Sequence, residues 1–212
     1  MDLLLYIPIL FFSVILHEYM HGYVAYRCGD DTAYLMGRLT FNPMVHIDVW
    51  GTIIIPVACY VSGVPMFGWA KPVPVNYYRL RNPKSDMAKV SIAGPLANIF
   101  LIVFAALIFK LLLAAQFSGF QVLYNALFYT IAVNLMLSIF NLIPVPPLDG
   151  SQVLAALLPK DLSIRYMRLE RYGMIIVIVL IVSGAFRLVF VPVFRFCLSL
   201  ILTFIGADNV KF

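Results

Sequence analysis

Two histidines and a glutamate near the N-terminus form the pattern His17-Glu18-Tyr19-Met20-His21. On an α-helix, residues four positions apart share one face, so His17 and His21 can offer two imidazoles to one metal ion. Glu18 lies beside them, where it can accept a proton from an attacking water. The spacing therefore predicts a hydrolytic metal site.

The apolar sequence around this pattern makes the prediction more specific. Within residues 3–26, Glu18 is the only acid, and apart from the two histidines the other ionisable groups are tyrosines. Polar and ionisable groups at membrane depth are costly and usually functional. The alternative is a pair of buried histidines that hydrogen-bond within a helical bundle, but this would leave Glu18 as a buried acid without a role.

A catalytic zinc normally has three protein ligands and keeps one position open. Asp149 is a candidate for the third ligand, because it follows three prolines at residues 144–147 that break an apolar helix. Broken helices at membrane depth are tolerated where they line a cavity or are buried in protein. His46 and Asp48 are the competing candidates, and we favour Asp149.

The composition is that of a membrane protein. The chain has 212 residues, of which 63% are hydrophobic and 12% charged, with a mean hydropathy of +0.95. Soluble domains are about 45–50% apolar and about 25% charged. The net charge of +5 comes from bases in the loops between apolar stretches, which indicates topology control rather than nucleic-acid binding. The three cysteines are scattered and form neither a CxxC pattern nor a disulfide framework.

The expected fold is an all-α polytopic membrane protein with about five to six transmembrane helices. Residues 3–26 form the first helix, and β-forming residues around a glycine at 32–43 predict a short β-hairpin or extended region. The apolar run at 51–63 is short for a crossing and is expected to be re-entrant. Further helices are expected over residues 87–116, 119–141, 164–183 and 187–205. Residues 1–158 would form the catalytic membrane core and residues 159–212 a C-terminal pair of helices, with no separate soluble domain.

The metal ligands must meet at one depth in the membrane. If residues 51–63 enter and return, the broken helix over 119–158 runs parallel to the first, and His17 and Asp149 both lie past the middle of their helices. Five spanning helices plus one re-entrant segment then place twelve Lys and Arg residues on one side and three on the other. The positive-inside rule puts the twelve in the cytoplasm, the N-terminus outside and the metal nearer the cytoplasmic face. A crossing at 51–63 would give ten against five, so the metal geometry decides.

Two motifs together resemble the site-2 protease family of intramembrane zinc metalloproteases. They are His17-Glu18-Tyr19-Met20-His21 and Asn141-Leu142-Ile143-Pro144-Val145-Pro146-Pro147-Leu148-Asp149-Gly150, which match the HExxH and NxxPxxPxDG hallmarks. Residues 37–43, 67–76 and 93–98 also resemble the compact prokaryotic branch, which lacks PDZ and CBS domains. The motif pair is very specific.

The resemblance implies a role for each matching residue. His17, His21 and Asp149 match the ligands of one Zn²⁺, and Glu18 matches the general base. Asn141 matches a residue that helps to hold the substrate carbonyl or its oxyanion.

Two further positions, His46 and Asn98, recur in this branch, and we expect auxiliary roles for them. The implied reaction is hydrolysis of peptide bonds within or next to transmembrane segments, the chemistry of regulated intramembrane proteolysis. The implied partners are a single-pass transmembrane substrate and the lipid bilayer of a prokaryotic inner membrane, without nucleic acid.

Two other classes of protein share some of these features. A metal transporter or channel also has buried His and Asp in broken helices, but it normally needs several ligands along a path. A catalytically inactive scaffold of the same fold would not need the acid Glu18. Both alternatives predict that Glu18→Gln changes little.

Overall fold

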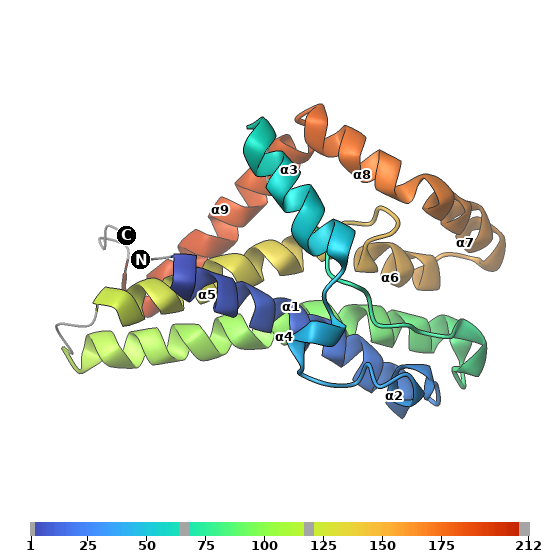
Figure 1. The fold of residues 1–212 in the computed structure, drawn as a ribbon, viewed down its shortest axis with the longest axis horizontal. Coiled ribbons are helices and arrows are strands. Elements are labelled where there is room, and N and C mark those ends of the chain that lie inside the picture. The colour runs from blue at the N-terminus through green and yellow to red at the C-terminus, as the bar shows by residue number, and fades with distance from the viewer. Residues whose placement is uncertain (1–2, 64–67, 117–120, 208–212) are drawn as a thin grey trace.

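The computed structural model describes residues 3–63, 68–116 and 121–207, and within these ranges all regular secondary structure is helical (Figure 1). The α-helices are α1 (Leu3–Arg27), α2 (Thr32–Leu35), α3 (Ile55–Ser62), α4 (Pro83–Ala114), α5 (Gln121–Asn141), α6 (Asp149–Leu157), α7 (Lys160–Met167), α8 (Gly173–Val182) and α9 (Ala185–Ile205). Short 3-10 turns cover Pro43–Val45, Tyr77–Arg79 and Arg168–Tyr172, and a π-helical turn over Val49–Ile54 leads into α3.

Four of the described helices, α1, α4, α5 and α9, are long and apolar enough to cross a membrane. The all-α, polytopic character expected from the composition is thus confirmed. Helix α4 packs against α1 and α5 along most of its length, and α6 packs on α4 (Figure 1). A hydrophobic core joins α4, α5 and α9 around Phe109 and Ile131, both of which are fully buried.

Close packing of the central helices follows from small and polar residues spaced four apart. Helix α4 places Ala93, Gly94 and Ala97 in the interior, and small residues allow neighbouring helix backbones to approach. A spacing of four keeps side chains on one helical face. The faces that meet carry Ser13, His17 and His21 on α1, Val90, Gly94 and Asn98 on α4, and Thr130, Asn134 and Ser138 on α5.

The predicted β-hairpin over residues 32–43 is wrong. No strand occurs in the described ranges, and this stretch forms α2 followed by an irregular loop. Asp30 lies just before α2, and its carboxylate accepts hydrogen bonds from the backbone N–H and the hydroxyl of Thr32, the first residue of the helix. Buried Arg38 donates to the carbonyls of Lys71 and Pro72 at 2.8 and 3.2 Å. The backbone N–H groups of residues 35–38 bond to the carbonyls of residues 31–34, so local helical turns rather than a paired strand satisfy the backbone here.

The predicted number of spanning helices is also corrected, from about five to six to four in the described ranges. The span expected over residues 164–183 is divided into α7, the 3-10 turn Arg168–Tyr172 and α8. Only the 10 residues of α8 are continuously apolar, and they measure about 15 Å at about 1.5 Å per residue. The hydrocarbon core is about 30 Å thick, so α8 is too short to cross it alone.

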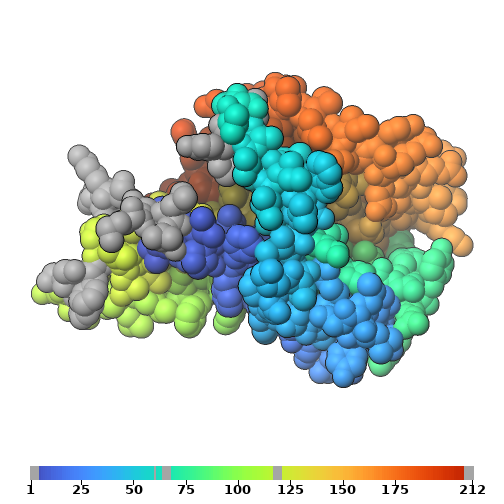
Figure 2. Space-filling model, viewed as in Figure 1, coloured from blue at the N-terminus to red at the C-terminus, as the bar shows by residue number. Residues whose placement is uncertain are grey.

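The segment from α2 to α3 lies over the C-terminal half of α1 in the space-filling view (Figure 2). Helix α1 contacts both α2 and the 3-10 turn Pro43–Val45. The helical segment Val49–Cys59 is apolar but shorter than a spanning helix. The half of α1 that carries His17 and His21 is therefore covered by chain on this side.

Candidate metal centre

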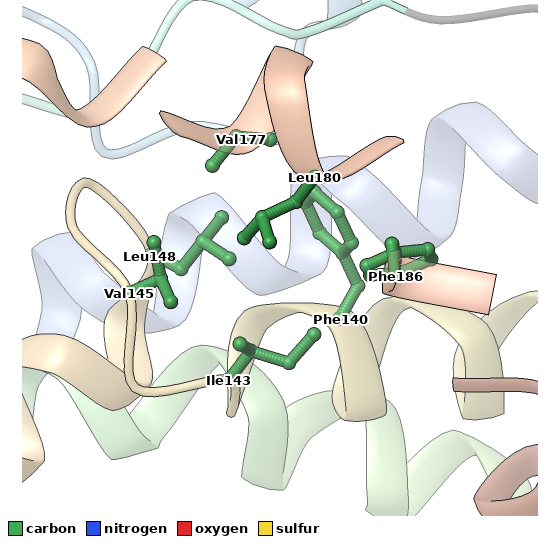
Figure 3. A pocket seen from close by; sticks show the side chains of 7 residues that line it. All are labelled: Phe140, Ile143, Val145, Leu148, Val177, Leu180 and Phe186. Atoms are coloured by element: carbon green, nitrogen blue, oxygen red, sulfur yellow. The ribbon is translucent and has the colours of Figure 1, made fainter. Parts of the chain in front are cut away.

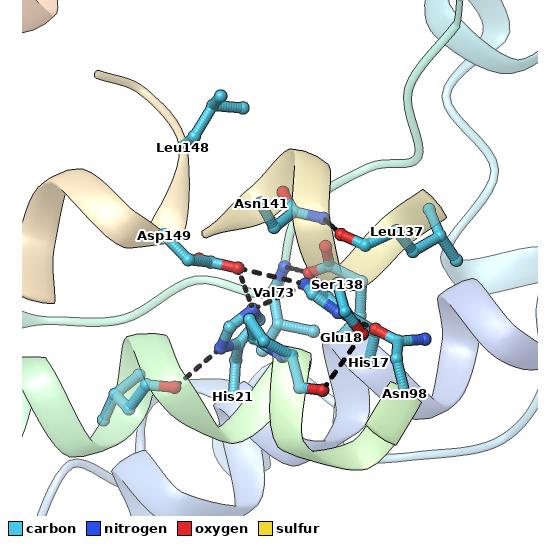
Figure 4. A network of polar contacts seen from close by, with 12 residues as sticks. His17, Glu18, His21, Val73, Asn98, Leu137, Ser138, Asn141, Leu148 and Asp149 are labelled. Carbon is cyan, nitrogen blue, oxygen red and sulfur yellow. Dashed lines mark hydrogen bonds and ion pairs between the residues drawn. The ribbon is translucent and has the colours of Figure 1, made fainter. Parts of the chain in front are cut away.

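Three side chains from two distant parts of the chain converge in the interior. His17 and His21 extend from α1, and Asp149, the first residue of α6, faces them (Figure 4). The Asp149 Oδ2 atom lies 3.2 Å from His17 Nε2 and 3.3 Å from His21 Nε2, and the two Nε2 atoms are 3.0 Å apart. Within the described residues, this is the group of His, Cys, Asp and Glu side chains that could hold a metal ion.

These distances fit a tetrahedral cation. Zinc binds imidazole nitrogen and carboxylate oxygen at about 2.0–2.2 Å, which places two tetrahedral ligands about 3.3 Å apart. Two imidazoles and one carboxylate also match the His and acid donors of catalytic zinc sites. His17 and His21 are 6% and 8% exposed, and Asp149 Oδ2 is buried without a hydrogen-bond donor among the described residues. The donor set therefore suits Zn²⁺.

Hydrogen bonds on the far side of each imidazole turn both Nε2 atoms toward Asp149. His21 Nδ1 lies 2.7 Å from the carbonyl oxygen of Val90, and His17 Nδ1 lies 2.5 Å from Asn98 Oδ1. Oxygen accepts in both contacts, so each Nδ1 carries the proton and each Nε2 of a neutral ring has a free lone pair. Three electron-rich atoms then meet, an arrangement that a cation stabilises.

Gly94 leaves the room that this group needs. A Cβ atom at residue 94 would lie 2.5 Å from His21 Nε2 and 2.6 Å from His17 Nε2. Any larger residue would therefore displace both rings. The small residue is required here by the site as well as by helix packing.

Glu18 is held by the extended segment that follows α3. Its Oε2 atom accepts a 2.8 Å hydrogen bond from the backbone N–H of Val73. The same segment is anchored by Arg38, by the bond from Lys71 N to the carbonyl of His46, and by the bond from Asn76 N to the Asp30 carboxylate. Glu18 therefore has a fixed neighbour on one oxygen.

Asp149 is positioned by the loop between α5 and α6 and by the C-terminal helices behind it. A Cβ atom at Gly150 would clash with the backbone of Leu142 and Ile143, so glycine lets the start of α6 approach the end of α5. On the other side, apolar side chains from the loop, α5, α8 and α9 surround a small pocket (Figure 3). They are Phe140, Ile143, Val145, Leu148, Val177, Leu180 and Phe186.

This loop is linked to α7 by a hydrogen bond and to α8 by a close backbone approach. The Tyr166 hydroxyl donates a 2.7 Å hydrogen bond to the carbonyl of Pro144, and burial raises the pKa of this phenol. The phenol therefore stays a donor at neutral pH. Gly173 lies against the loop so closely that a Cβ atom there would be 2.6 Å from the Pro146 carbonyl oxygen.

The remaining residues singled out from the sequence lie outside the cluster of three ligand atoms. Asn141 ends α5 beside it, and its side-chain N–H donates to the Leu137 carbonyl at 3.0 Å (Figure 4). His46 is buried and donates from Nε2 to the Thr40 carbonyl at 2.9 Å. The Asp48 carboxylate caps the helical turn after it through the N–H of Gly51 at 2.7 Å. The two competing candidates for the third ligand thus hold loops.

Several residues that shape the site were not predicted from the sequence. Gly94 and Asn134 stand at spacings of four from other interior residues, a signal that was present in the sequence. The contribution of Val73 is a backbone N–H, which residue type does not reveal. The contact between Tyr166 and Pro144 depends on how α7 folds back over the loop.

Comparisons with known proteins agree with this geometry. The family model of peptidase family M50 matches residues 5–124 and 114–184. The Bacillus subtilis protein YwhC, assigned as a zinc metalloprotease, is 40% identical over 201 residues, which cover 86% of each chain. Zinc metalloprotease MJ0392 of Methanocaldococcus jannaschii is 30% identical over 153 residues, covering 72% of this chain and 34% of the relative. No solved structure matches the chain.

A helical membrane bundle with two histidines and an aspartate at one interior point defines a membrane metallohydrolase. The chain belongs to peptidase family M50, the site-2 proteases. It is an intramembrane zinc metalloprotease, and the expected family, enzyme class and cofactor are confirmed. The transporter and scaffold alternatives are not favoured.

Proposed function

We propose that His17, His21 and Asp149 hold the catalytic Zn²⁺ and that Glu18 is the general base for cleavage of single-pass transmembrane proteins. The observation that carries the proposal is the convergence of three ligand atoms at 3.0–3.3 Å from segments about 130 residues apart. A cluster of this kind in one place, rather than along a path, supports hydrolysis over transport.

When bound, Zn²⁺ polarises the scissile carbonyl and lowers the pKa of a water ligand toward about 7. Glu18 accepts the proton of the attacking water and delivers it to the leaving amine. Val73 N–H occupies Oε2 of Glu18, so Oε1 remains for this proton transfer. General acid–base catalysis of this kind contributes about 10²- to 10⁴-fold to the rate.

Asn141 is proposed to stabilise the developing oxyanion. An asparagine amide has two N–H donors, and the structure commits one of them to the carbonyl of Leu137. The second N–H is left for the substrate oxygen. One such donor is worth roughly 3 kcal/mol in other hydrolases.

The substrate must unwind before it is cut, because a helix in a membrane has its backbone hydrogen-bonded internally. We propose a prokaryotic inner membrane location with the N-terminus outside and the site nearer the cytoplasm. The bases assigned to the cytoplasmic side support this orientation. They are Arg27, Arg38, Lys71, Arg79, Arg81, Lys84, Lys89, Lys160, Arg165, Arg168 and Arg171.

The same proposal assigns different roles to the two parts of the chain. Residues 1–158 would form the catalytic core, and residues 159–212 would support it. The contacts of Tyr166 and Gly173 with the loop before Asp149 favour this supporting role. His46 is proposed to hold the loop over α1 rather than to touch the substrate.

Glu18→Gln tests the proposal in liposomes that contain a tagged single-pass membrane protein. Cleavage should fall by at least about 100-fold, while zinc content and thermal stability stay at wild-type values. Glu170→Gln is the matched control, because Glu170 is the other glutamate of the chain and is exposed. Unchanged cleavage by Glu18→Gln would overturn the assignment.

A further inference from the structure

A chain of buried amide and hydroxyl groups leads away from His17 into the middle of the bundle. Asn98 Oδ1 contacts His17 Nδ1, and Asn98 Nδ2 lies 2.7 Å from Asn134 Oδ1. Asn134 Nδ2 in turn donates to Ser13 Oγ at 2.9 Å and to the Thr130 carbonyl at 2.8 Å. All four side chains, His17, Asn98, Asn134 and Ser13, are at most 6% exposed.

Two backbone carbonyls set the direction of the hydrogen bonds in this chain, that of Thr130 and that of Ser13, whose oxygen lies 3.4 Å from Asn98 Nδ2. The oxygen of Thr130 can only accept, so the Asn134 atom that faces it must be the amide nitrogen. Asn134 then turns its oxygen toward Asn98, which must donate from Nδ2. This leaves Asn98 Oδ1 toward His17 and requires a proton on His17 Nδ1.

The opposite orientation would harm the metal site. If Asn98 were flipped, its amide would donate to His17 Nδ1, and the ring proton would move to Nε2. That atom lies 3.2 Å from Asp149 Oδ2, where a lone pair is needed for zinc. With Asn134 fixed, the flip would also turn the side-chain oxygen of Asn98 toward that of Asn134. Two acceptors would then face each other without a proton between them. His21 needs no such chain, because Val90 supplies a carbonyl directly.

We infer that Asn134 is a positioning residue that acts through Asn98 to fix His17 with a protonated Nδ1 and a free Nε2. The inference rests on the proposed role of His17 as a zinc ligand. It gives Asn98 a definite task and adds Asn134, on a third helix, to the residues that determine zinc affinity. Outer-shell partners of metal ligands typically change metal affinity or activity by about 10- to 100-fold.

The first test is zinc affinity by competition with a chelator, with the full-length protein in detergent. Asn134→Leu should bind zinc about 10- to 100-fold more weakly than wild type, although Asn134 contacts neither zinc nor a ligand. Asn125→Leu is the matched control on the same helix, since the Asn125 side chain accepts a hydrogen bond only from the nearby Gln121 among the described contacts. Wild-type affinity in Asn134→Leu would overturn the inference.

Asn134→Leu alone leaves the buried amide of Asn98 without this partner and can therefore misfold. The double variant Asn98→Leu/Asn134→Leu removes both amides and is included for this reason. Replacing both partners of a buried hydrogen bond with apolar groups is often nearly neutral for stability. This variant should fold and still bind zinc at least tenfold more weakly. Zinc binding at the wild-type level in the folded double variant would equally overturn the inference.

The second readout separates positioning of His17 from general loosening of the bundle. In zinc-loaded protein labelled with ¹⁵N-histidine, the Nδ1–H signal of His17 should shift or exchange faster with water in Asn134→Leu, while that of His21 stays unchanged. Equal changes at both histidines, or none, would contradict the inference. If Asn134→Leu changes the His17 signal alone but the wild-type protein cleaves no membrane substrate, the proposed function fails and the positioning role stands.

Discussion

The backbone N–H of Val73 donates a 2.8 Å hydrogen bond to Glu18 Oε2 across 55 positions of sequence. The partners come from the first helix and from an extended segment flanked by Pro72 and Pro74. The segment that follows α3 thus orients the proposed base.

Val73→Pro removes this N–H without changing Glu18. Residue 73 precedes Pro74 and is already restricted to extended backbone, which proline tolerates. A hydrogen bond to a charged group is worth about 1.5–3 kcal/mol, so we expect kcat to fall about tenfold or more with zinc affinity unchanged. Val73→Ala keeps the N–H and should retain most of the activity. Equal kcat values for the two variants, measured on a tagged membrane substrate, would contradict this role.

Gly94→Ala should abolish most activity by displacing the imidazoles. The helix propensity of alanine, about 1 kcal/mol better than that of glycine, offsets part of the overpacking cost of about 1–3 kcal/mol, so metal-free protein should melt at or only slightly below the wild-type temperature. Displacement of catalytic groups by about 1 Å can cost on the order of 100-fold in rate. Zinc titration and cleavage assays on the same preparation measure both effects. Normal zinc affinity in this variant would show that the imidazole rings do not lie against residue 94.

The C-terminal helices should influence zinc binding through the loop before Asp149. Tyr166→Phe removes one hydrogen bond, worth about 1 kcal/mol, and should weaken zinc binding about fivefold. Tyr172→Phe is a matched control, because the exposed Tyr172 ring is contacted by Arg171 rather than by the loop. Gly173→Ala should have a larger effect than Tyr166→Phe, since it moves backbone. Wild-type zinc affinity in both Tyr166→Phe and Gly173→Ala would show that the C-terminal helices do not influence zinc binding.

Removal of zinc should reduce both activity and stability. A ligand at about 100 times its dissociation constant stabilises the folded state by about 2.7 kcal/mol. For a chain of about this length, the shift in Tm should be about 5–10 °C. Chelation should stop cleavage, and added zinc should restore it. Asp149→Asn should show no zinc-dependent shift, and a full shift in that variant would exclude Asp149 as a ligand.

The chemistry of the site was more predictable from sequence than the local structure around it. The spacing of His17 and His21 and the proline break before Asp149 are visible in residue types alone. The hairpin prediction failed because the backbone N–H groups of residues 35–38 bond to the carbonyls of residues 31–34, and Asp30 accepts from the N–H of Thr32, contacts that β-propensity does not include. The span over 164–183 failed because its first half carries exposed arginines, and only α8 is continuously apolar.

Long-range contacts account for the rest of what could not be predicted. The link from Asn134 to His17 was accessible in part, because polar residues in apolar helices need partners. Its direction required the position of the Thr130 carbonyl. The contact of Val73 with Glu18 also required the structure, because the residue type does not indicate the direction of a backbone N–H.

Helix α4 has a consequence for how the site is hydrated. Between Lys89 and Lys110 it holds 20 uncharged residues, whose length of about 30 Å equals the thickness of the hydrocarbon layer. Gly94 stands five residues after Lys89, so about 7.5 Å of helix separates the imidazoles from the level of that charge. With the hydrocarbon layer placed over these 20 residues, the nearer boundary would lie about a third as far from the imidazoles as the opposite one. The one water molecule consumed for each cut bond would then have its shorter route to the site from the Lys89 end of α4.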